Sequence, residues 1–171
     1  AQYHGVNGKR DNVRFIKGPD KDVENTVWDR VYITTLFSFE WNKISETIDY
    51  ASKITGQQHN KIFVGGIAAS LMKGKFLEQD KWRGVRVIGG LLDKSPAESL
   101  ELDDFEEELY SDDKSSQPIE DMIPDYSILD QIDYKYPVID AYFAYATRGC
   151  VRKCAFCGVP KLEGGMREMP P

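Results

Sequence analysis

Cysteine is nearly absent from this chain of 171 residues, because the three that it contains all lie between positions 150 and 157. An odd number of clustered cysteines does not build the disulfide framework of a small secreted domain. The sequence has no run of 18 apolar residues that could span a membrane, and its polar start, "AQYHGVNGK", has no signal-peptide pattern. We therefore expect a cytoplasmic protein that does not interact with a membrane.

The charge is unevenly distributed along the chain. The formal net charge is -6, but residues 98–133 contain 14 of the 28 acidic residues and a single base, Lys114. The remaining residues are mildly basic and give no specific signal for nucleic-acid binding. A strongly acidic stretch of this kind is typical of a solvated linker. An acidic segment that binds a partner is the alternative.

Apolar runs alternate with helical patterns before the acidic stretch. We predict three strands and two helices in the order strand, helix, strand, helix, strand, over residues 31–39, 42–56, 61–66, 67–79 and 84–93. This order indicates an α/β fold with a parallel sheet, and strands that are apolar on both faces indicate burial between two helix layers. Residues 1–97 are therefore predicted to form a Rossmann-like domain, which we expect to be trimmed at its N-terminus.

Two glycine pairs, Gly65-Gly66 and Gly89-Gly90, lie at the carboxyl ends of predicted strands. Ligands bind at that edge of open parallel sheets, where glycine lets a backbone approach them closely. The sequence contains neither G-x-G-x-x-G nor a Walker motif, so no nucleotide fingerprint is met. Tight turns between strand and helix are the alternative interpretation.

The three cysteines follow one more predicted strand, over residues 141–146. Reactive groups on a loop after a strand are typical of (β/α) barrels. We therefore interpret residues 134–171 as the first strand and cluster loop of a truncated barrel, separated from the first domain by the linker at 98–133.

The cysteine spacing is C-x3-C-x2-C, formed by Cys150, Cys154 and Cys157. Three thiolates on one compact loop suit a [4Fe–4S] cluster and leave one iron open. A structural zinc site would need a fourth ligand, for which the chain offers only His4 or His59. A C-x-x-C redox couple would leave Cys150 without a role.

The cysteine segment, with Phe156 directly before the third cysteine, resembles the signature of the radical SAM superfamily. The resemblance implies that the open iron binds S-adenosylmethionine and that reduction by an external electron donor cleaves this cofactor to a 5′-deoxyadenosyl radical. It also implies that the backbone of Phe156 lies against the adenine. The chain would then be a fragment of a radical SAM enzyme acting on an unknown substrate. No further catalytic residue is identified. The alternative function is a non-catalytic α/β binding module with a small zinc or redox-active cysteine appendage.

The first domain is similar to the cobalamin-binding-like domain that precedes the barrel in one radical SAM class. That similarity places four residues along the nucleotide tail of a cobalamin: Thr34, Thr35, Gly65 and Gly66. The D-x-H-x-x-G motif that supplies a histidine ligand to cobalt is missing. Three bulky aromatics lie at the carboxyl edge of the predicted sheet: Phe37, Phe39 and Trp41. We therefore expect no histidine-ligated cobalamin, and we expect the aromatics to pack against a neighbouring domain.

Overall fold

The computed structural model describes residues 12–91, 118, 126–133, 135, 141 and 145–169. The chain divides into two compact units: one combines Ala1–Lys17 with Leu91–Phe143, and the other combines Gly18–Gly90 with Ala144–Pro171. The second unit holds the sheet and all three cysteines. The predicted domain boundaries, near residues 97 and 134, lie outside the described residues and stay predictions.

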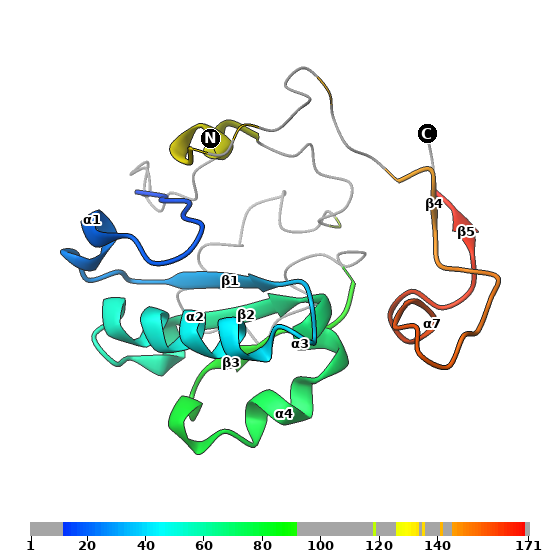
Figure 1. Ribbon diagram of the computed structural model, residues 1–171, viewed down its shortest axis with the longest axis horizontal. Helices are drawn as coiled ribbons and strands as arrows, with labels where there is room; N and C mark the ends of the chain where they lie inside the picture. Colours follow the sequence, from blue (N-terminus) through cyan, green and yellow to red (C-terminus); the bar gives the residue numbers. More distant parts are fainter. Residues whose placement is uncertain are drawn as a thin grey trace. The chain divides into compact units, whose positions relative to one another are not determined.

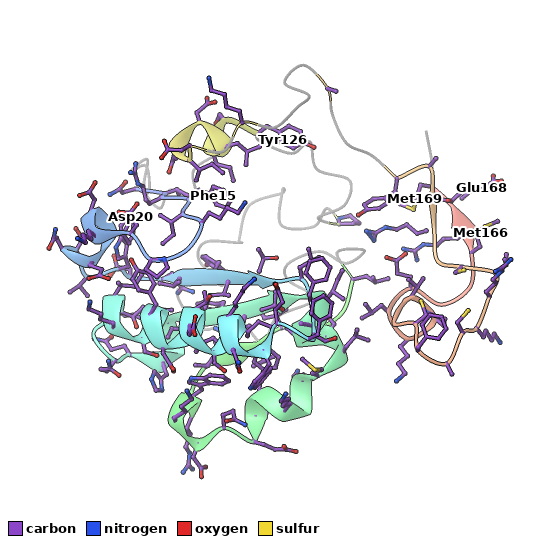
Figure 2. All side chains as sticks on the ribbon, in the orientation of Figure 1. Phe15, Asp20, Tyr126, Met166, Glu168 and Met169 are labelled. Carbon is purple, nitrogen blue, oxygen red and sulfur yellow. The ribbon has the colours of Figure 1, made fainter. Side chains whose placement is uncertain are left out.

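In the first unit, the structure describes one 3-10 helix, η6 (Tyr126–Gln131). The backbone N–H of Phe15 donates to the side-chain oxygen of Gln131 at 2.8 Å; Figure 2 labels Phe15 and Tyr126. The predicted acidic linker is otherwise described only at residues 118, 132 and 133.

Three parallel strands form the sheet of the second unit, in the order β1-β2-β3 (Figure 1). Their bounds are Val31–Thr35 for β1, Ile62–Gly66 for β2 and Arg86–Val87 for β3. The first two strands pair along their whole length, from Val31 opposite Ile62 to Thr35 opposite Gly66. The predicted mixed α/β architecture with a parallel sheet is therefore confirmed.

One short helix precedes the sheet and the others connect its strands (Figure 1). Their bounds are Lys21–Glu24 for α1, Trp41–Ile54 for α2, His59–Lys61 for η2, Ile67–Leu71 for α3, Lys73–Leu77 for α4 and Asp80–Trp82 for η3. The predicted stop of the first helix at Gly56 is confirmed, because Gly56 and Gln57 both have a φ near +63°, which ends a helix. Within the described residues, no helix is long and apolar enough to cross a membrane.

Two predicted strands and one predicted helix are wrong in extent. The first strand ends at Thr35 instead of Phe39, and the third covers only Arg86–Val87. The predicted helix over 67–79 is broken at Met72, whose φ of -126° and ψ of 28° lie outside helical geometry.

The hydrophobic core lies between one face of the sheet and the helices. Ile33, Val64 and Val87 occupy matching positions on that face of the three strands, and α2 contributes Ile48, which is fully buried. Burial of each such side chain stabilises the fold by roughly 1.5–3 kcal/mol. The prediction that every strand is buried on both faces is wrong for β1, where exposed and buried residues alternate because only one face of this strand is covered.

Phe63 lies on the other face of the sheet and is only 2% exposed. The ring of Tyr32 stacks on it at 5.0 Å between centroids. The guanidinium groups of Arg30 and Arg86 lie 5.3 and 4.9 Å from its centroid. Cation–π contacts thus help cover this second face.

Asp49 of α2 links that helix to η3. Its carboxylate accepts a hydrogen bond from the indole Nε1 of Trp82 at 2.8 Å and from Nζ of Lys81 at 2.9 Å. Burial alone would raise the pKa of Asp49, but the hydrogen bonds from Trp82 and Lys81 and the charges of Lys81 and His59 outweigh it and lower this pKa.

Replacing Asp49 by Asn should therefore weaken the fold at neutral pH and not in acid. A lowered folded-state pKa gives stability that is present above the pKa of the unfolded chain and is lost as the pH falls through the folded value. We expect Asp49→Asn to lower the free energy of unfolding at pH 7 by less than about 1 kcal/mol, because the carboxylate is half exposed. The difference should vanish well below about pH 4. Urea unfolding at several pH values, with Glu46→Gln on the same helix as control, measures this; a pH-independent difference would contradict it.

Candidate functional site

The hydroxyl of Thr35 joins three elements at the carboxyl edge of the sheet. Its Oγ1 donates to the carbonyl oxygen of Gly65 at 2.7 Å and accepts from the backbone N–H of Ala69 in α3 at 3.0 Å. The residue is 3% exposed. The hydroxyl that the resemblance places at a cofactor tail is therefore used to hold β1, β2 and α3 together, whereas Thr34 is exposed.

Gly66 makes the turn from β2 into α3. Its φ of 97° and ψ of -172° belong to a region that only glycine adopts readily. A Cβ at this position would lie 2.8 Å from the backbone nitrogen of Thr35 and even closer to its carbonyl oxygen. At Gly65, a Cβ would make ordinary contact with the carbonyl oxygen of Ile88 at 3.7 Å. The tight-turn interpretation therefore accounts for Gly66, and Gly65 is the more open of the two.

The side chain of Ser70 links the two glycine pairs, and this role was not predicted from the sequence. Its hydroxyl donates to the carbonyl oxygen of Gly66 at 2.8 Å and accepts from the backbone N–H of Gly90 at 3.0 Å. A Cβ on Gly89 would lie 3.3 Å from the Cα of Ser70, which is a tight contact. The only sequence signal was a serine four residues after a glycine at a strand end.

Exposed apolar side chains follow β1 at the same edge. Phe37 and Phe39 are 46% and 81% exposed, and their rings stack at 5.1 Å. Their expected packing against a neighbouring domain stays a prediction. Trp41 differs from them, because it packs against Phe76 at 4.9 Å and Trp82 at 5.7 Å between ring centroids. Trp41 therefore packs within the α/β domain instead of against a neighbouring domain.

The cysteines lie in a loop whose two ends are paired. β4 (Thr147–Arg148) and β5 (Arg167–Glu168) are antiparallel, and the backbone N–H of Met169 donates to the carbonyl oxygen of Ala146 at 3.0 Å. Figure 2 labels Glu168 and Met169 at this end of the loop. Residues 142–144 of the predicted strand lie outside the described residues, and residues 141, 145 and 146 are not in a strand. The start of a barrel stays a prediction.

The three thiols are free and partly buried. The backbone N–H of Cys157 donates to the carbonyl oxygen of Cys154 at 3.1 Å, which closes a turn around Phe156. Phe156 is 94% exposed. The Sγ of Cys150 accepts the backbone N–H of Arg152 at 3.4 Å. Cys154 and Cys157 thus share one turn, and Cys150 makes a separate contact with the backbone of Arg152.

The chemistry of the donor set suits an iron–sulfur cluster, because three thiolates on one loop can each bind a different iron of a [4Fe–4S] cluster and leave the fourth iron open. Their side chains are not gathered: among the residues that the structure describes, no three His, Cys, Asp or Glu side chains are placed to hold a metal ion. Metal binding therefore requires the loop to bring its thiols together. His59, one possible fourth zinc ligand, has its Nδ1 3.1 Å from the carbonyl oxygen of Arg83; His4 lies outside the described residues.

A scan against protein-family models, a search of curated proteins and a search of solved structures found no match to this chain. Comparison therefore assigns no family, and the radical SAM resemblance stays a prediction from the cysteine segment and the first domain.

The two neighbouring glycines at the end of β2 should respond very differently to alanine. Gly66→Ala should lower the free energy of unfolding by at least about 1–3 kcal/mol, the cost of holding a non-glycine residue in this conformation, and its Cβ would also displace Thr35. Gly65→Ala should change it by less than about 1 kcal/mol, because the new methyl group has room. Thermal or urea unfolding of both variants checks this. Equal losses would contradict the assignment of the turn to Gly66.

Proposed function

We propose that Cys150, Cys154 and Cys157 bind a [4Fe–4S] cluster and that the chain is part of a radical SAM enzyme. The observation that carries the proposal is the set of three free thiols on one loop with paired ends. Because β4 and β5 pair at the ends of the loop, the residues between them can rearrange to bring the thiols to a cluster while the two strands stay paired.

Three thiolate ligands leave one iron of the cluster without a protein ligand. When bound, such a cluster supplies the electron that cleaves S-adenosylmethionine and starts radical chemistry on a substrate, and an external donor must provide that electron. Phe156 lies exposed next to Cys157, and in this proposal its backbone lies against the adenine. A reducing compartment keeps the thiols available, in keeping with a cytoplasmic protein.

The α/β domain serves in this proposal as a scaffold rather than as a histidine-ligated cobalamin site. The hydroxyl of Thr35 and the backbone at Gly66 are already used by the fold. Of the four positions with a proposed role along a cofactor tail, Thr34 and Gly66 are exposed, Gly65 is half-buried and Thr35 is buried. Rossmann-like topology is part of the same proposal.

Single cysteine substitutions test the cluster. The chain purified and reconstituted without oxygen should be brown and hold about four iron and four sulfide per chain. Cys→Ala at any of the three positions should reduce the iron content almost as much as the triple change, because the ligands act as a unit. Val151→Ala changes the same loop at an exposed position and should leave the iron content unchanged.

Full iron occupancy in any single cysteine variant would rule out three-thiolate binding. A colourless protein that contains zinc would support the alternative of a non-catalytic module with a zinc appendage. A protein without metal that forms a reversible Cys154–Cys157 disulfide would support the redox appendage.

A further inference from the structure

The carboxylate of Glu163 reaches back to the start of the cysteine loop. Its Oε2 accepts the backbone N–H of Gly149 at 2.8 Å, fourteen residues earlier in the chain. Glu163 directly follows α7 (Val159–Leu162), and its own N–H donates to the carbonyl oxygen of Val159 at 2.8 Å. The glutamate is therefore placed by the helix that comes after the cysteines.

Gly149 is the residue between β4 and Cys150, and its backbone is tightly constrained. Its φ is 78°, and a Cβ there would lie 2.7 Å from the carbonyl carbon of Gly165. Glycine is needed for this close approach of the two ends of the loop. The hydrogen bond from its N–H to Glu163 fixes the direction in which the chain enters Cys150.

Helix α7 is itself held in place within the same unit. It packs against α3, and Gly158 lies so close to Leu71 that a Cβ on the glycine would be 2.8 Å from its Cδ1. Through its hydrogen bond to Gly149, Glu163 therefore fixes the backbone before Cys150 relative to α7. A charged acceptor suits this task, because carboxylate hydrogen bonds are roughly twice as strong as neutral ones.

The three cysteines differ in their need for such an anchor. Cys154 and Cys157 are fixed relative to each other by the hydrogen bond between their own backbones. Cys150 lies outside this turn. Its distance from the other two thiols therefore depends on where β4 ends and on the direction of the backbone at that point. We propose that Glu163 is a positioning residue that fixes the backbone directly before Cys150, from which the Cys150 thiol reaches the shared cluster. The role in cluster binding rests on the proposed function. The hydrogen bond between Glu163 and Gly149 does not depend on it.

Amide hydrogen exchange of the metal-free chain tests the anchor directly. We expect exchange at Gly149 to be about tenfold faster in Glu163→Ala than in the wild type, because one charge-assisted hydrogen bond is lost. Glu163→Gln keeps an acceptor oxygen and should show at most about threefold faster exchange. Glu168→Ala, at the exposed position of β5, should leave exchange at Gly149 unchanged. Unchanged exchange in Glu163→Ala would overturn the proposal.

Iron loss from the reconstituted chain tests the positioning role. A chelator should remove iron several-fold faster from Glu163→Ala than from the wild type, whereas Glu163→Gln and Glu168→Ala should stay close to it. Thermal unfolding of all variants separates this effect from general destabilisation. If exchange at Gly149 rises and iron loss does not, Glu163 has only a structural role and the inference is wrong. If the wild type binds no iron, the proposed function fails, and exchange at Gly149 still decides whether Glu163 anchors the loop.

Discussion

The contact between Thr35 and Gly66 is the constraint on which the α/β part of this chain depends. The two residues face each other in the register of β1 and β2. The Thr35 side chain bonds to the carbonyl before Gly66 and to an N–H of the helix that follows it. A buried hydroxyl left without partners would cost about 1–3 kcal/mol, and a Cβ on Gly66 would collide with the Thr35 backbone. This arrangement buries Thr35, whereas Gly66 stays exposed at the edge of the sheet.

The cysteine loop is built by a different set of interactions. Antiparallel pairing of β4 and β5 closes its base, and the turn between Cys154 and Cys157 orders its centre. Packing of α7 on α3 connects the loop to the domain that Thr35 and Gly66 hold together. In a metal site on this loop, the β4–β5 pair and α7 would hold the loop in place, and the three thiols would have to come together.

Regular patterns in the sequence predicted the regular parts of the fold. Apolar residues such as Ile44 and Ile48 at helical spacing predicted α2, and a short apolar run predicted β2. The end of β1 could not be predicted, because Phe37 and Phe39 have high strand propensity but are exposed. The roles of Ser70 and Glu163 were missed because their partners lie 20 and 14 residues away in the chain. The cysteine spacing predicted the candidate ligands. It carries no information on where the thiols lie, and in the structure these three are too far apart to hold a metal ion together.

The central claim is that three cysteines of one loop bind a cluster with one open iron. Electron paramagnetic resonance of the reduced, anaerobically reconstituted chain tests it most directly, with and without S-adenosylmethionine. Our account predicts the signal of a reduced [4Fe–4S] cluster whose g values shift when S-adenosylmethionine occupies the open iron. A cluster signal that S-adenosylmethionine leaves unchanged, or a chain that takes up zinc and no iron, would contradict it.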